Sequence, residues 1–188
     1  MKKYIFILIV VVISSCNNSK KVEVADKKVV KKELRPFFDS DKIDHYYLDF
    51  SEGEFEHSAN DNTVQKEKKK EFSSFFYGYY PENIPKKNFE NLLLKYNYKK
   101  SNLSVKNQNE IENIFSEKDS LKNDACACIA EYRDIFIFKK NTKTVGIAKI
   151  CFKNARFQII GSKLDVSGFG LWSELDKLKS ILRPNEKP

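Results

Sequence analysis

Residues 132–152, YRDIFIFKKNTKTVGIAKICF, contain two apolar runs joined by a short polar segment. Tyr132–Phe138 and Val145–Phe152 are rich in β-branched and aromatic residues, which favour strands, and Lys139–Thr144 between them is polar. Two such runs on either side of a short polar connection predict a β-hairpin. Arg156–Ile160 follows closely and has the same composition. The sequence therefore predicts three consecutive antiparallel strands.

The pairing of the two hairpin strands follows from the turn. A symmetric turn over Lys139–Thr144 would place Asp134 opposite Lys149 and Cys151 opposite Tyr132. Opposite charges that face each other across two strands stabilise a sheet by about 0.2–1 kcal/mol. We therefore expect Asp134 to take part in the sheet and not in catalysis.

The rest of the chain has helical and strand patterns of ordinary length. Apolar spacing predicts helices at 63–76, 85–96, 107–118 and 171–183, and strands at 42–50 and 98–105. Segment 72–80 overlaps the first of these helices and would also fit a strand. Asn107 and Glu110 are expected to form a capping box at the start of the third helix. The predicted fold class is α+β, a single domain over residues 36–188 with an antiparallel sheet and helices packed on one side.

The amino terminus has the three parts of a secretory signal peptide. Lys2 and Lys3 are followed by the apolar run Tyr4–Ile13 and then by small and polar residues. The apolar run is shorter than the roughly 20 residues that a membrane-spanning helix needs. We therefore expect residues 1–15 to be a signal peptide that is removed.

The segment Ile13–Cys16 (ISSC) resembles the lipobox of bacterial lipoproteins, in which an aliphatic residue and two small residues precede a cysteine. The resemblance implies that Cys16 carries a thioether-linked diacylglycerol and that the new amino terminus is acylated, for example by palmitate. Two or more such chains anchor a protein stably to a membrane. The expected location is the bacterial cell envelope, and Asn17 favours the outer membrane because it is not the aspartate that retains some lipoproteins at the inner membrane.

Charge is concentrated in the segment that follows the cysteine. Residues 16–35 are rich in lysine and contain no aromatic side chain, so a basic tether is predicted there. The whole chain has a formal net charge of +8, but much of the excess lies in the first 35 residues and the remainder is only slightly basic. A nucleic-acid partner would require a clustered basic face. Nucleic acid is therefore excluded as a partner, and the membrane is expected as one.

Three cysteines remain beside Cys16. Cys126 and Cys128 are two residues apart, a poor geometry for a bond between them. Either of them could pair with Cys151 if the preceding segment curled back over the sheet. A structural disulfide or buried thiols, a labile redox pair, and a metal site all remain open. A metal would need a fourth ligand, which C-x-x-C spacing from Cys151 would put at Asn154.

Segment Cys128–Gly161 resembles uncharacterised envelope lipoproteins of bacteria, in which a second cysteine commonly stands at the place of Asn154. That resemblance implies no known activity, and the asparagine argues against a paired-cysteine or zinc role. No metal or cofactor is expected.

The remaining candidates do not converge on a catalytic site. His45 and His57 cannot be placed near a nucleophile from sequence, so no catalytic residue is assigned. Six aromatic residues could form a stacking platform for sugars or peptides, although runs of this kind usually supply core: Phe72, Phe75, Phe76, Tyr77, Tyr79 and Tyr80. The predicted function is a non-catalytic module that binds a protein, peptide or glycan partner or supports the envelope. The alternative is a thiol-based or metal-dependent periplasmic activity centred on Cys126, Cys128 and Cys151.

Overall fold

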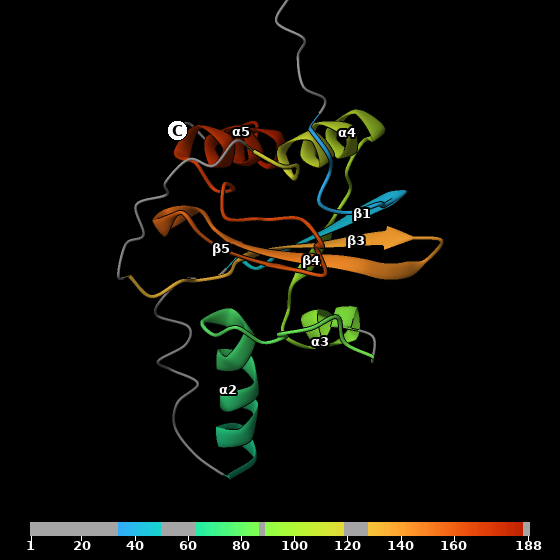
Figure 1. The fold of residues 1–188 in the computed structure, drawn as a ribbon. Coiled ribbons are helices and arrows are strands. Elements are labelled where there is room, and N and C mark those ends of the chain that lie inside the picture. The colour runs from blue at the N-terminus through green and yellow to red at the C-terminus, as the bar shows by residue number, and fades with distance from the viewer. Residues whose placement is uncertain (1–33, 50–62, 87–88, 119–127, 186–188) are drawn as a thin grey trace, which may run out of the picture. The chain divides into compact units, whose positions relative to one another are not determined.

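The computed structural model describes residues 34–49, 63–86, 89–118 and 128–185, which belong to one compact unit (Figure 1). Its centre is a five-stranded antiparallel sheet with the strand order β2-β1-β3-β4-β5. The strands are β1 (Lys42–Tyr47), β2 (Lys99–Ser101), β3 (Asp134–Lys140), β4 (Lys143–Cys151) and β5 (Arg156–Ile160). The helices are α2 (Thr63–Phe76), α3 (Phe89–Lys95), α4 (Val105–Ile114) and α5 (Trp172–Leu182). The predicted α+β class with an antiparallel sheet in a single domain is confirmed.

The helices cover both faces of the sheet and not one face as expected. In Figure 1, α4 and α5 lie on one side of the strands and α2 and α3 lie on the other. The first five residues of the central strand β3 are all buried because both of its faces are covered. A continuous apolar run is typical of a strand buried on both sides. The run IFIF at residues 135–138 was therefore a sign of two helical layers.

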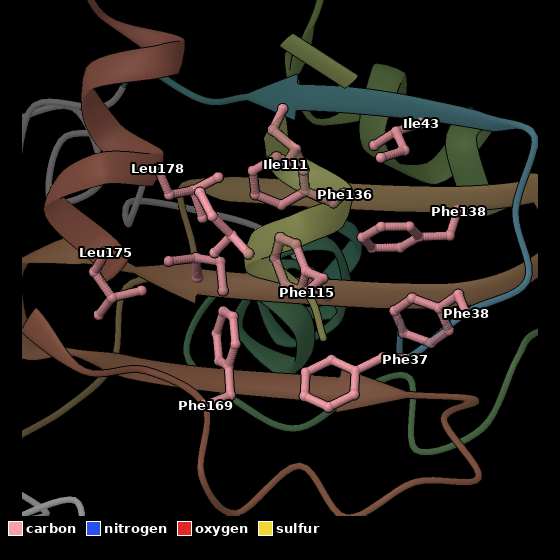
Figure 2. Packing of buried hydrophobic residues seen from close by; sticks show 13 residues of the cluster. Phe37, Phe38, Ile43, Ile111, Phe115, Phe136, Phe138, Phe169, Leu175 and Leu178 are labelled. Carbon is pink, nitrogen blue, oxygen red and sulfur yellow. The ribbon is translucent and has the colours of Figure 1, made fainter. Parts of the chain in front are cut away.

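The face covered by α4 and α5 contains an aromatic core (Figure 2). Phe115 of the segment after α4 stacks on Phe169 with ring centres 4.8 Å apart. Phe38 lies against Phe138 at 4.3 Å, directly over Gly146, where an added Cβ would lie 2.2 Å from the Phe38 ring. Strand β4 therefore needs glycine at this position for the ring to fit.

The opposite face has a second core, formed by α2 and α3. Its fully buried side chains include Phe75 and Leu93, which pack in one cluster with Ile135, Ile137 and Ile147 of the central strands. The helix over residues 63–76 is thus confirmed, and its last residues supply part of this core. The helix predicted at 85–96 is shorter, because α3 begins at Phe89.

The hairpin is present, but its register differs from the prediction by one residue. Asn141 and Thr142 have positive φ angles of 47° and 68°, as a two-residue hairpin turn requires. The register then shifts at Phe138 and Lys139, which pair with Gly146 and Thr144, so that Val145 is the extra residue of a bulge. A shift of one residue moves every later side chain to the other face.

The bulge separates two residues that the symmetric turn had paired. Asp134 lies opposite Ile150, and Lys149 lies opposite Ile135. The predicted pair between Asp134 and Lys149 is therefore wrong, because the two side chains point to opposite faces of the sheet. Tyr132 precedes β3 and is not a strand partner of Cys151, which pairs with Arg156.

Helix α4 begins earlier than the predicted capping box. The Ser104 hydroxyl accepts a hydrogen bond from the backbone N–H of Asn107 at 3.1 Å, so Ser104 is the N-cap. Asn107 is inside the helix, and the predicted capping box at Asn107 and Glu110 is wrong. No helix in the described ranges is long and apolar enough to cross a membrane. The predicted signal peptide, Cys16 and most of the predicted tether lie outside the described residues.

Candidate functional site

A buried lysine on β4 has an unusual set of partners. The side chain of Lys149 is fully buried, and its Nζ donates hydrogen bonds to the carbonyl oxygens of Gly78 at 2.6 Å and Tyr80 at 2.9 Å. The Nζ also lies 4.3 Å from the centre of the Tyr132 ring, within cation–π range. None of these partners is a carboxylate. Because burial disfavours the charged ammonium, the pKa of Lys149 is lowered from 10.5 to about 7.

The neighbouring strand supplies a second side chain that holds the same loop. Gln158 is the cross-strand partner of Lys149, and its Nε2 donates to the carbonyl oxygens of Tyr79 at 2.5 Å and Pro81 at 3.0 Å. Together the two side chains bind four consecutive carbonyls, those of residues 78–81. The loop backbone is thus fixed from the sheet, through contacts that do not depend on the side chains of the loop.

The side chains of Tyr79 and Tyr80 in this loop face solvent. The exposed fraction is 59% for Tyr79 and 45% for Tyr80. The Arg156 guanidinium donates to the Tyr79 hydroxyl at 3.3 Å, and the Tyr80 ring lies edge-on to Phe89. Beside them is an open hollow of about 670 Å³, within the size range of ligand sites. Its lining combines ring, proline and polar side chains: Ser74, Gly78, Tyr79, Tyr80, Pro81, Glu82, Asn83, Ile84 and Pro85.

The predicted aromatic platform is therefore only partly available to a ligand. Phe72, Phe75 and Phe76 are buried in the core beneath α2, as aromatic runs usually are. Tyr79 and Tyr80 are the members of the run that are exposed. We call the segment 77–85 the tyrosine loop, since these two rings define its surface.

A second polar cluster lies on the opposite face of the sheet. His45 Nδ1 lies 2.9 Å from the Ser101 hydroxyl, and His45 Nε2 lies 3.0 Å from the Asp134 carboxylate. Arg183 at the end of α5 donates from Nη2 to both oxygens of Asp134 at 2.7 Å. Serine, histidine and aspartate are the residue types of a nucleophilic triad. No local pattern in the sequence marks this set, because pairing of β1 with β2 and β3 brings it together.

The burial of this cluster favours a structural role. The His45 and Asp134 side chains are 3% and 2% exposed, and the imidazole packs on the Phe136 ring at 4.7 Å. The Arg183 guanidinium covers the Asp134 carboxylate as well. Because both side chains are buried, a substrate has no access to the imidazole. We interpret the four side chains as a satisfied polar network that joins the end of α5 to three strands.

The charged residues near α3 form a further network. Asp44 is buried and contacts Lys100 at 2.8 Å and Lys139 at 2.7 Å, and Lys139 also pairs with Glu90. Burial raises the pKa of Asp44, but the hydrogen bonds from Lys100 and Lys139 outweigh it and hold the pKa below its usual value. Tyr46 donates to Glu90 at 2.9 Å, so the same network joins β1 to α3.

The cysteines do not form an accessible reactive set among the described residues. Cys151 is a free thiol that is 2% exposed and packs with Ala130 and Tyr132. Cys128 is disulfide-bonded and is therefore not a free thiol. Cys16 and Cys126 also lie outside them.

The position expected for a fourth metal ligand has another role. The Asn154 side chain donates to the Ile129 carbonyl at 2.8 Å and so holds the segment after Cys128 against the end of β4. Within the ranges that the structure describes, no group of three histidine, cysteine or acidic side chains could hold a metal ion.

One of these features had a signal in the sequence. Lys149 stands in the middle of the apolar strand VGIAKICF, where a charged residue must be buried if the strand is central. The two carbonyls that Lys149 binds had no such signal, because Gly78 and Tyr80 lie about 70 residues earlier in the chain. No protein-family model, curated protein or solved structure matches this chain. Its function is therefore inferred from its own residues.

Proposed function

We propose that this protein is a lipid-anchored lipoprotein of the bacterial cell envelope whose domain is a non-catalytic binding module. The anchor is Cys16, which is the last residue of the lipobox-like segment Ile13–Cys16 at the end of the proposed signal peptide. The outer membrane is favoured by Asn17. The binding surface is the tyrosine loop, and its partner is a protein, peptide or glycan of the envelope.

The single observation that supports a binding role is the way in which the tyrosine loop is held. Lys149 and Gln158 bind the carbonyls of residues 78–81 from beneath, while Tyr79 and Tyr80 remain exposed beside a hollow. A loop that is already ordered loses less conformational entropy when a ligand binds. Tyrosine suits such a surface because its ring is apolar and its hydroxyl forms hydrogen bonds.

The alternative, a thiol-based or metal-dependent activity at Cys126, Cys128 and Cys151, has less support. A reactive thiol needs an accessible and electropositive setting. Cys151 is buried against Ala130 and Tyr132, a setting in which a thiol acts as a small apolar side chain.

Two experiments test the proposal separately. The anchor is tested by fatty-acid labelling of Cys16→Ala in cells, which should abolish incorporation of label; undiminished labelling would exclude Cys16 as the lipid site. The binding surface is tested by in-cell crosslinking of the full chain carrying Tyr79→Ser and Tyr80→Ser. A matched control is Val105→Ser, since Val105 is 75% exposed on α4.

The expected outcome is selective loss of the crosslinked partner. The tyrosine variant should lose its adducts, while the Val105 variant keeps them and both proteins unfold at similar urea concentrations. The backbone of the loop remains fixed in the tyrosine variant because Lys149 and Gln158 bind only carbonyl groups there. Adducts that are equally strong in both variants would refute the tyrosine loop as the binding surface.

A further inference from the structure

The point at which the chain enters the domain is firmly held. The Arg35 carbonyl accepts a hydrogen bond from the Glu117 N–H at 2.8 Å, and the Arg35 guanidinium donates twice to the Glu117 carboxylate at 2.7 Å. Pro36 then forms a β-bridge with Ser116. Arg35, the last residue of the predicted tether, is thus docked on the segment after α4. Leu34 immediately before it is 44% exposed.

The single tryptophan of the chain begins a helix that is linked to this entry point by an ion pair. Trp172 is the first residue of α5 and is 56% exposed. Glu174 in the same helical turn forms an ion pair with Lys118 at 3.0 Å, and Lys118 directly follows the Glu117 that holds Arg35. Figure 1 shows the first described residues on the side of the sheet that α4 and α5 cover. Leu34 and Trp172 are therefore exposed apolar residues on two segments that lie on the same side of the sheet and are joined through Glu117 and Lys118.

From this arrangement we infer that the surface formed by Leu34, Arg35 and Trp172 rests on the lipid headgroup region of the membrane that carries the anchor. The inference depends on the proposed lipid anchor at Cys16. It assigns one face of the domain to the membrane, whereas α3 and the tyrosine loop pack on the other face of the sheet. That orientation presents the proposed binding surface to the envelope and not to the lipid.

The occupant is a lipid surface because of where the chain outside the described residues begins. Residues 16–33 connect the lipid-bearing cysteine to Leu34, and even fully extended they span no more than about 65 Å. The domain is thus kept near the membrane, so that a contact too weak to bind free lipid is still populated when tethered. Tryptophan is enriched at membrane interfaces because its ring is apolar and its N–H stays hydrated. The Arg35 guanidinium, whose side chain is 68% exposed, can contact headgroup phosphates.

Isolated exposed apolar residues are common and need no explanation on their own. Val105, Ile129 and Leu94 are also exposed by more than half. Trp172 differs from these three because it begins the helix that Glu174 joins, through Lys118, to the segment on which Arg35 is docked.

The test uses Trp172 itself as the probe. The full-length lipidated protein is reconstituted into phosphatidylcholine vesicles with or without bromine on the acyl chains, and tryptophan emission is recorded after flotation. The matched control moves the single tryptophan to α3 through the double variant Trp172→Phe, Leu94→Trp. Leu94 is 54% exposed and belongs to α3, the helix that Figure 1 shows on the opposite side of the sheet.

The expected result is that Trp172 emission lies at shorter wavelength in both vesicle types and is mostly quenched in the brominated vesicles. Tryptophan at position 94 should show neither effect. If floated protein shows equal emission in both vesicle types, the membrane contact is refuted although the anchor stands. A wavelength shift that grows with protein density and is insensitive to bromine would indicate contact between copies and would also refute it. Protein that does not float at all would refute the anchor, and the inference with it.

Discussion

Replacement of Lys149 by methionine should change the way in which stability depends on pH. Methionine is similar in length and apolar, so the variant keeps much of the packing while removing the ionisable group. In the wild type, Lys149 is fully buried and its pKa is lowered to about 7 because burial disfavours the charge. The neutral amine retains two N–H groups, enough to hold the carbonyls of Gly78 and Tyr80.

The sign and size of the effect follow from proton linkage. Between pH 7 and 10.5 the unfolded chain keeps a proton on Lys149 that the folded domain has released. Stability therefore rises with pH through this window. Below pH 7 and above pH 10.5, Lys149 causes no change of stability with pH. At 1.36 kcal/mol for each pH unit, a pKa lowered from 10.5 to about 7 corresponds to about 5 kcal/mol. The wild type should gain that amount relative to Lys149→Met as the pH rises from 7 to 10.5.

Urea unfolding of both proteins at intervals from pH 6 to 10.5 measures the difference directly. Lys143→Met is the matched control for the loss of a lysine, because Lys143 is exposed at the start of the same strand. A wild-type advantage over Lys149→Met that stays constant across the window would refute the reasoning. It would mean that the two carbonyls and the Tyr132 ring keep the buried ammonium charged throughout.

Three further predictions concern packing, the polar network and the thiol. Gly146→Ala should destabilise the domain by about 1–3 kcal/mol in urea unfolding, because its Cβ would overlap the Phe38 ring, and an unchanged midpoint would contradict this close packing. Arg183→Met should destabilise the domain by up to about 3–5 kcal/mol, because the buried Asp134 carboxylate loses its guanidinium partner and keeps only the His45 ring, and adding Asp134→Asn should restore part of the loss; a double variant no more stable than the single one would argue against the pairing. Iodoacetamide should label Cys151 only as fast as the domain unfolds, because the thiol is buried, and rapid labelling of folded protein would revive the thiol-based alternative.

Local patterns were sufficient for much of the fold. The apolar runs around Lys139–Thr144 predicted the hairpin, and leucine spacing predicted α5, because strand and helix periodicity are read within a few residues. Cap positions were less secure. Ser104 and Asn107 both have side chains that can cap, and only the helix itself shows that the chain turns at the serine.

The sequence by itself determined the strands of the hairpin and the α+β class, since these depend on residues close together in the chain. Tertiary structure decided what those strands face. One extra residue, Val145, moved Asp134 and Lys149 to opposite faces, and no local pattern records a bulge. The candidate site arose in the same way: Lys149 acquires its partners in the tyrosine loop only because α2 packs beneath the sheet and the chain after it crosses β4. Contacts between residues far apart in sequence depend on packing, which periodicity cannot express.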